Sequence, residues 1–220
     1  GKEPWNRNAA FVKLARNSRS VCVDLKLKKG REIFLELVGH ADVVIENFSA
    51  STMSNLNLDY ETLVEANPNI IYLTMPGFGK TGPYKDWVAF GPIIEPMSGL
   101  TAAMGYSLEE PRNSGVALVD PTSATSAAAA IVTAIRSRKK KVGGSIKIEM
   151  SLHEAGVSFN GPWLIDSQLG APSPVLNNGH PNMCPHGVYP CKGEDEWLAL
   201  ACEDQKDWEI LAKIDESLDP

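Results

Sequence analysis

The chain has 220 residues, with 21 Lys and Arg against 27 Asp and Glu, which gives a formal charge of −6. Its 43% hydrophobic and 22% charged residues exclude a disordered or fibrous protein and are enough to bury a sizeable core. An isoelectric point of about 5.3 argues against a general nucleic-acid binder, because contacts with phosphates need a basic face.

The cysteines and the first residue bear on the cellular setting. The four cysteines are Cys22, Cys184, Cys191 and Cys202. No two of them have CxxC spacing, which favours reduced thiols in an intracellular protein over disulfides or a zinc site. We therefore expect a cytoplasmic protein without a metal site. Residue 1 is Gly rather than Met, so we expect a piece of a longer protein, and the sequence leaves organellar targeting open.

The first third of the chain alternates predicted strands with predicted helices. Runs of β-branched and apolar residues predict strands at Ser20–Leu25, Asp42–Phe48 and Asn69–Met75. Apolar periodicity and capping signals predict helices at Lys28–Gly39 and Tyr60–Asn67. This alternation predicts right-handed crossovers and a parallel sheet, and hence an α/β fold.

The middle of the chain is less regular. Pro76–Met97 is rich in Gly and Pro, which predicts an ordered loop with one or two short helices. Thr122–Lys141 predicts a helix with many small residues, too short and too rich in Ser and Thr to span a membrane. Ser145–Ser151 alternates like a strand, and Leu152–Leu169 predicts a further helix.

These elements predict two domains. Residues 1–170 form a large α/β domain, and residues 171–185 are a linker rich in Pro, Asn and Gly. Residues 186–220 begin a smaller α+β domain, because Val188–Pro190 and Trp197–Cys202 flank a polar turn and predict a hairpin.

One glycine motif follows a predicted strand. Gly77–Gly82 matches GxGxxG, but a dinucleotide-binding turn needs a helix to open there, and Pro83 follows with no apolar periodicity. A phosphate-binding P-loop also fails, because Thr74 stands where its first Gly is needed. We therefore expect a shaped loop on the substrate side.

The histidines and the basic cluster have structural interpretations. His40, His153, His180 and His186 show no metal-binding or catalytic spacing. The cluster Arg136–Lys141 is typical of a solvated helix C-terminus, where cations complement the helix dipole, and binding of an anionic ligand is the second interpretation.

Asp120 is the candidate for chemistry. It ends the apolar run Gly115–Asp120, two residues before the predicted helix. A carboxylate there would feel the field of a helix N-terminus and could accept amide hydrogen bonds. From spacing alone, a plain capping residue is the favoured interpretation.

Motifs along almost the whole chain resemble one family. They are Asn17–Lys26, Ala41–Phe48, Asn67–Tyr72, Gly77–Pro83, Gly99–Gly105, Ser114–Asp120, Ile148–Ala155 and Pro185–Tyr189. In this order and spacing the chain is similar to the family III CoA-transferases, which include formyl-CoA transferase, carnitine CoA-transferase and α-methylacyl-CoA racemases. The resemblance implies a Rossmann-like, CoA-binding large domain, here without its first strand, a small domain, and an interlocked homodimer. From the acidic composition and the short apolar stretches we expect no nucleic-acid or membrane partner.

The resemblance also assigns roles to residues. Asp120 matches the family's nucleophile, and a carboxylate with a pKa near 3.9 needs no base to activate it. It would take an acyl group from an acyl-CoA as a mixed anhydride, become an aspartyl-CoA thioester, and pass CoA to an acceptor carboxylic acid. CoA would be a substrate, and no tightly bound cofactor is implied.

The CoA contacts carry over by position. Val23, Leu25 and Lys26 match residues that receive the adenine and its phosphates, and Lys26 would supply a point charge for phosphate. Asn47 and Phe48 match residues along the pantetheine path. Without the resemblance, Val23 and Leu25 would be interpreted as sheet core.

Two positions depart from the family pattern. Asn55 stands where many relatives have an Arg for the CoA phosphates, which weakens the expected diphosphate contact. Phe90 stands where the racemase branch has a His, and Phe cannot move a proton. We therefore expect a CoA-transferase, with two alternatives: a racemase or other isomerase of the same family, and a non-catalytic remnant that only binds a partner.

Overall fold

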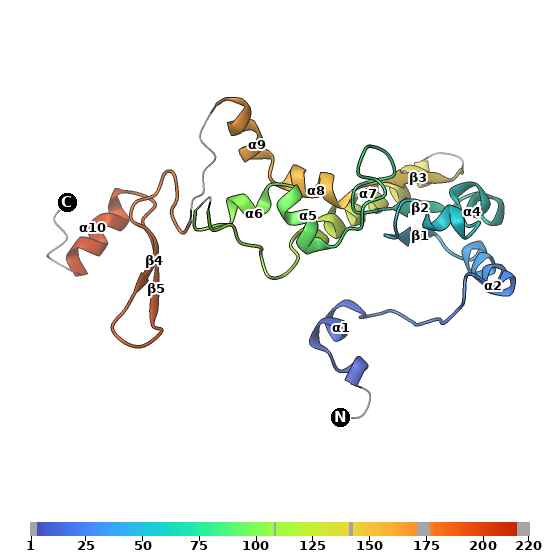
Figure 1. The fold of residues 1–220 in the computed structure, drawn as a ribbon, viewed down its shortest axis with the longest axis horizontal. Coiled ribbons are helices and arrows are strands. Elements are labelled where there is room, and N and C mark those ends of the chain that lie inside the picture. The colour runs from blue at the N-terminus through green and yellow to red at the C-terminus, as the bar shows by residue number, and fades with distance from the viewer. Residues whose placement is uncertain (1–3, 108, 141–142, 171–176, 215–220) are drawn as a thin grey trace.

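A parallel sheet forms the centre of the fold. The computed structural model describes residues 4–107, 109–140, 143–170 and 177–214 (Figure 1). The strands β1 (Val43–Glu46), β2 (Ile71–Thr74) and β3 (Ile146–Glu149) lie side by side in the order β1-β2-β3, all parallel. Every residue of β2 is buried, as expected for the central strand of a sheet covered on both faces. The predicted α/β fold with a parallel sheet is confirmed.

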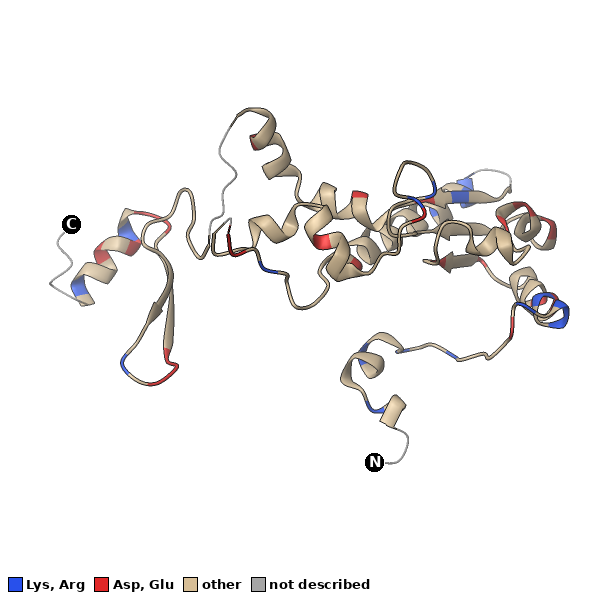
Figure 2. Cartoon of the chain, in the orientation of Figure 1, with Lys and Arg blue, Asp and Glu red and all other residues tan. Residues whose placement is uncertain are grey.

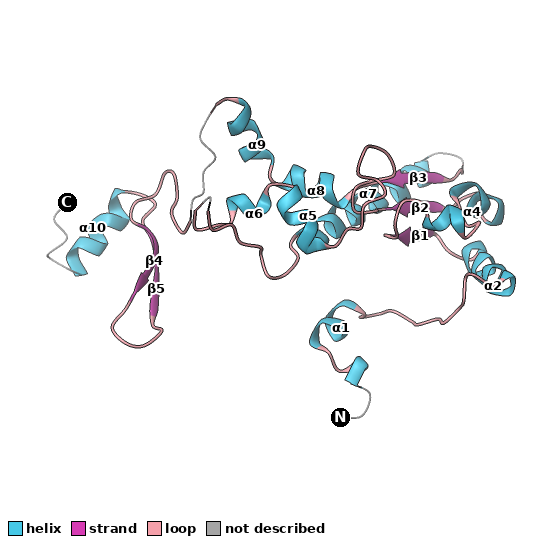
Figure 3. Cartoon of the chain, viewed as in Figure 1, coloured by secondary structure: helices cyan, strands magenta, loops and turns pink. Residues whose placement is uncertain are grey.

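Helices cover the two faces of β2 (Figure 3). Tyr72 packs into a cluster with residues of α2 (Lys28–Gly39), α3 (Thr52–Asn55) and α4 (Tyr60–Ala66). The next residue, Leu73, packs into a second cluster with residues of α5 (Gly91–Met97), α6 (Leu100–Ala103), α7 (Val119–Lys140) and α8 (Leu152–Phe159). Neighbouring side chains of a strand point to opposite faces, so β2 joins two separate apolar clusters.

The remaining elements lie towards the ends of the chain. They are η1 (Pro4–Asn6), α1 (Ala9–Leu14), α9 (Gly161–Gln168), β4 (His186–Pro190), β5 (Trp197–Ala201) and α10 (Gln205–Ile214). The predicted hairpin is confirmed, because β4 and β5 pair antiparallel, from His186 with Ala201 to Pro190 with Trp197. The division into two domains stays a prediction, and residues 171–176 of the predicted linker lie outside the described residues. In the described part of the chain, no helix is long and apolar enough to cross a membrane.

The predicted strand at Ser20–Leu25 is wrong. The segment makes no ladder with another strand, and Val21 is 64% exposed. A β-branched run becomes a strand only where a neighbour takes its backbone hydrogen bonds. Among the strands that the structure describes, β1 is paired only with β2. Instead, the Arg31 guanidinium donates to the carbonyl oxygens of Leu25 and Lys26, which fixes the end of the segment against α2.

The single helix predicted at Leu152–Leu169 is also wrong, because it is interrupted at Asn160. Helix α8 ends at Phe159, and α9 begins at Gly161 with Pro162 in its first turn. Proline lacks a backbone N–H and is tolerated in a first turn but not inside a helix. The Asn160 side-chain amide donates to the carbonyl oxygen of Ser98 at 3.2 Å, so the break is anchored to the end of α5.

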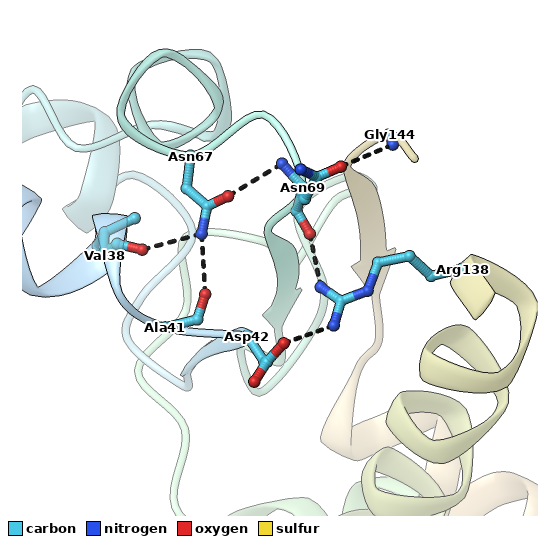
Figure 4. Close-up of polar contacts among 7 residues, drawn as sticks. All are labelled: Val38, Ala41, Asp42, Asn67, Asn69, Arg138 and Gly144. Carbon is cyan, nitrogen blue, oxygen red and sulfur yellow. Dashed lines mark hydrogen bonds and ion pairs between the residues drawn. The ribbon is translucent and has the colours of Figure 1, made fainter. Parts of the chain in front are cut away.

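A polar network joins the amino ends of the strands to the end of α7 (Figure 4). The Asn67 amide donates to the carbonyl oxygens of Val38 at 3.1 Å and Ala41 at 2.8 Å. The Arg138 guanidinium donates to the carbonyl oxygen of Asn69 at 2.7 Å and to the Asp42 carboxylate. Only 20% of the Arg138 side chain is exposed, so this member of the basic cluster ties two elements together rather than ending a solvated helix.

Replacing Asn67 by Ala is expected to lower the free energy of unfolding by about 1–3 kcal/mol, because two half-buried carbonyl oxygens lose their donor. Urea denaturation measures the loss. Asn55→Ala is the matched control, because Asn55 is exposed and makes one long side-chain hydrogen bond, to Ser51. Equal stability of the two variants would contradict this role of Asn67.

Candidate active site

Asp120 lies in the first turn of α7, which begins at Val119, three residues earlier than predicted. Its backbone N–H donates to the carbonyl oxygen of Ala117 at 3.0 Å. Its side chain is exposed, and among the described residues no hydrogen bond or ion pair engages its carboxylate. The amide hydrogen bonds that the sequence led us to expect are therefore not formed within the described residues.

The surroundings of Asp120 disfavour its charge. Partial burial and, next, the negative charge of Glu95 raise the pKa of Asp120 above its ordinary value. A perturbed carboxylate of this kind is typical of a functional site. The effect is opposite to the stabilisation by a helix N-terminus expected from the sequence.

Helix α5 approaches Asp120 closely because it begins with a glycine. A Cβ placed on Gly91 would lie 2.8 Å from Oδ2 of Asp120 and 2.6 Å from the Cβ of Ala117. The Asp120 carboxylate can therefore keep its present position only if residue 91 has no side chain. In Figure 2, α5 and α8, which pack together, carry acidic residues but no Lys or Arg.

Glu95, also on α5, is a site feature that the sequence reasoning missed. Its side chain is fully buried. It accepts hydrogen bonds from the backbone N–H and hydroxyl of Ser114 and from the backbone N–H of Leu118. Although burial alone would raise the pKa of Glu95, these bonds lower it below the ordinary value. One acidic residue in an otherwise apolar helix was the available signal.

Asn47 and Phe48, two of the residues matched to CoA contacts, line a pocket of about 340 Å³. They follow β1 directly, and Pro76 and Gly77, which follow β2, form another part of the wall. The pocket therefore lies at the carboxyl ends of neighbouring parallel strands, where open α/β sheets bind ligands. Its other lining residues, absent from our prediction, are Ser49, Lys85, Asp86, Trp87, Val88 and Ala89.

Val23, Leu25 and Lys26 do not line this pocket. Leu25 packs against the core cluster around Tyr72, and Val23 is half-buried. Lys26 is exposed just before α2. The structure therefore brings two of the five residues matched to CoA contacts together and places the other three on a separate segment.

The glycine motif forms part of the pocket wall. The Gly77 carbonyl oxygen accepts from the backbone N–H of His153 at 2.9 Å and from the Ser151 hydroxyl at 3.1 Å, which fastens the loop to α8. Phe78 packs against the rings of Tyr84, Trp87 and His153. No helix opens within the motif, so it lacks the geometry of a dinucleotide-binding turn.

Two of the four histidines, His153 and His186, hydrogen-bond to backbone carbonyl oxygens. The His153 ring bonds to the carbonyl oxygen of Met97, and the His186 ring to that of Asn178. In the described residues, no three His, Cys, Asp or Glu side chains gather so that they could hold a metal ion.

Comparison with known proteins identifies the family. The family model described as CoA-transferase family III matches residues 2–217, and the chain belongs to this family. It is 32% identical over 188 residues to a succinyl-CoA–D-citramalate CoA-transferase of Chloroflexus aurantiacus, covering 85% of this chain and 46% of that protein. It is 35% identical over 218 residues to a succinate–glutarate CoA-transferase of Agrobacterium fabrum, covering 95% of this chain and 52% of that protein.

A solved structure agrees with this assignment. A CAIB/BAIF family protein from Brucella suis superposes with a TM-score of 0.80 at 30% identity, over 90% of this chain and 52% of that one. The chain therefore spans about half the length of the relatives that it matches.

Proposed function

We propose that the protein transfers CoA from an acyl-CoA donor to a carboxylic acid acceptor, with Asp120 as the nucleophile. The observation that carries the proposal is the short connection between the carboxylate and the pocket. Ala89 lines the pocket, and Gly91, two residues later, lies against Asp120. Two residues span at most about 7 Å, so a thioester at the end of a pantetheine arm in this pocket can reach the carboxylate.

The proposed chemistry needs only carboxylates and sulfur. An Asp120 oxygen bonds to the acyl carbon of the donor, the C–S bond breaks, and CoA thiolate leaves a mixed anhydride on Asp120. The thiolate attacks Cγ of Asp120, releases the donor acid and forms an aspartyl-CoA thioester. The acceptor carboxylate attacks the same Cγ and expels the thiolate, which then attacks the acyl carbon of the acceptor and frees Asp120. Each intermediate is a thioester or an anhydride, so no ATP is required, and water must be kept out.

The substrates named for the relatives guide the choice of substrates to test. Succinyl-CoA is named for one relative, and succinate and glutarate for another. We propose short dicarboxylic acids and their CoA thioesters as the first pairs to test.

The expected interlocked homodimer and cytoplasmic location are part of the proposal. Exposed apolar side chains on α1 (Phe11, Val12 and Leu14) support the dimer, because they leave apolar surface for a partner to cover.

The test is a mass-spectrometric screen of the full-length protein with pairs of acyl-CoA and acid in deuterated water. Formation of the acceptor's CoA thioester without deuterium at the α-carbon of the donor supports transfer. Deuterium wash-in without an acceptor acid would identify a racemase instead, against the expectation from Phe90. No product and no exchange with any pair would favour the non-catalytic alternative.

Lys26→Ala is expected to raise KM for acyl-CoA roughly tenfold with little change in kcat, because a charge-assisted contact with phosphate contributes about 1.5 kcal/mol. Initial rates at varied acyl-CoA concentration measure the effect. Lys29→Ala is the control, because Lys29 is an exposed lysine on α2 that faces Glu32. Equal KM values for the two variants would remove Lys26 from the CoA site.

A further inference from the structure

The turn that leads into Asp120 has an unfavourable backbone. Gly115 has a φ of 72° and Ala117 a φ of 49°. For Ala this left-handed conformation costs about 1–2 kcal/mol, and such strain persists only where the surroundings hold it. Something must therefore fix the turn at residues 114–118.

Glu95 holds both ends of this turn. Its Oε2 accepts from the Ser114 N–H at 3.0 Å, and its Oε1 accepts from the Ser114 hydroxyl and the Leu118 N–H, both at 2.6 Å. The two anchored residues flank Gly115 and Ala117. Because the Glu95 side chain is fully buried, water does not compete for these bonds, and each is stronger than its counterpart in solvent.

Hydrogen bonds join this turn to the first turn of α7, which contains Asp120. The Ala117 carbonyl oxygen accepts from the Asp120 N–H at 3.0 Å, and the Leu118 carbonyl oxygen accepts from the Thr122 N–H at 3.2 Å and the Thr122 hydroxyl at 2.8 Å. These bonds start α7. On α5, Glu95 lies one turn after Gly91, which touches the Asp120 carboxylate. Helix α5 therefore contacts the Asp120 carboxylate through Gly91 and holds the turn at residues 114–118 through Glu95.

We propose that Glu95 is the positioning residue of this site: its buried carboxylate fixes the turn at residues 114–118 and thereby sets the position of Asp120. The inference rests on the proposed function of Asp120. Glu95 lines no wall of the pocket of Asn47 and Phe48, so its role is separate from CoA binding. Its charge also acts on Asp120, since it contributes to the raised pKa of that carboxylate.

Glu95→Gln in the full-length protein tests the proposal. An amide nitrogen at either oxygen position would face a backbone N–H, of Ser114 or of Leu118, so one bond to the turn is lost in both orientations. We expect kcat to fall at least about tenfold, since small displacements of a reacting group are costly, with KM for acyl-CoA within about twofold of wild type. Loss of the Glu95 charge lowers the pKa of Asp120, so the acid limb of the pH–rate profile moves to lower pH. A merely structural role would lower the stability of the fold but leave kcat of the folded protein unchanged.

Ser114→Ala is the second variant, in case Glu95→Gln folds poorly. It keeps the Glu95 charge and both backbone hydrogen bonds to Glu95. It loses the hydroxyl, which donates to Glu95 and accepts longer bonds from the backbone N–H groups of Val116 and Leu118. We therefore expect a smaller fall in kcat and an unmoved acid limb. If Glu95→Gln had the kcat and the acid limb of the wild type while Asp120→Asn was inactive, the positioning role of Glu95 would be overturned and the proposed function would stand. Normal transfer by Asp120→Asn would overturn the proposed function and this role with it.

Discussion

Asp120→Asn is expected to lower the rate of CoA transfer by at least about three orders of magnitude, because an amide cannot form the anhydride or the thioester on which each half of the reaction depends. KM for acyl-CoA is expected to change little, since the pocket is lined by other residues. Steady-state kinetics with the best substrate pair measures both. Asp166→Asn, a change of an exposed carboxylate on α9, is the control and should keep full activity.

The same substitution is expected to leave the protein folded and slightly more stable at neutral pH. The raised pKa of Asp120 means that the fold penalises its ionised form. This penalty is present above the pKa of the folded state and disappears as pH falls through it. Thermal melts should therefore show a small gain for Asp120→Asn at pH 7 that vanishes in acid. A clear loss of stability at pH 7 would mean that the carboxylate has a structural role.

Gly91→Ala is expected to lower transfer about tenfold to a hundredfold while the protein stays folded. The added methyl group would meet the Cβ of Ala117 at 2.6 Å and Oδ2 of Asp120 at 2.8 Å. The carboxylate can rotate away, but the Cβ of Ala117 moves only with its backbone, so the turn before Asp120 must shift. Steady-state kinetics and a thermal melt separate lost activity from lost stability.

Gly161→Ala is the matched control for this variant. Gly161 also begins a helix and is also followed by proline, and no heavy atom lies within 4 Å of the position of an added Cβ. We expect its activity to be that of the wild type. If Gly91→Ala were as active as Gly161→Ala, CoA transfer would not depend on the close approach of α5 to Asp120, and this prediction would be wrong.

The fold could be predicted from the sequence where local patterns and packing agree. The apolar run at Asn69–Met75 became the buried strand β2, and the amphipathic pattern at Lys28–Gly39 became α2 with the predicted bounds. Ser20–Leu25 has strand composition but no strand beside it, and pairing is a property of the fold rather than of the segment. The break at Asn160 depends on a contact with Ser98, which is distant in sequence.

The candidate site could be predicted only in part. Asp120 was singled out by its position before a helix and by the family resemblance, and its assignment as nucleophile stays a proposal. Glu95 was missed because its partners, Ser114 and Leu118, lie about twenty residues further along the chain. The Gly91 contact was missed for the same reason, since periodicity describes neighbours within one element and not contacts between two elements.

The most direct test is to incubate the full-length protein with an acyl-CoA in the absence of an acceptor acid and trap the enzyme with hydroxylamine. Peptide mass spectrometry should find a hydroxamate on the peptide that contains Asp120, and none in Asp120→Asn. Acyl label on Cys184 or Cys191 with an unmodified Asp120 peptide would contradict the assignment of the nucleophile.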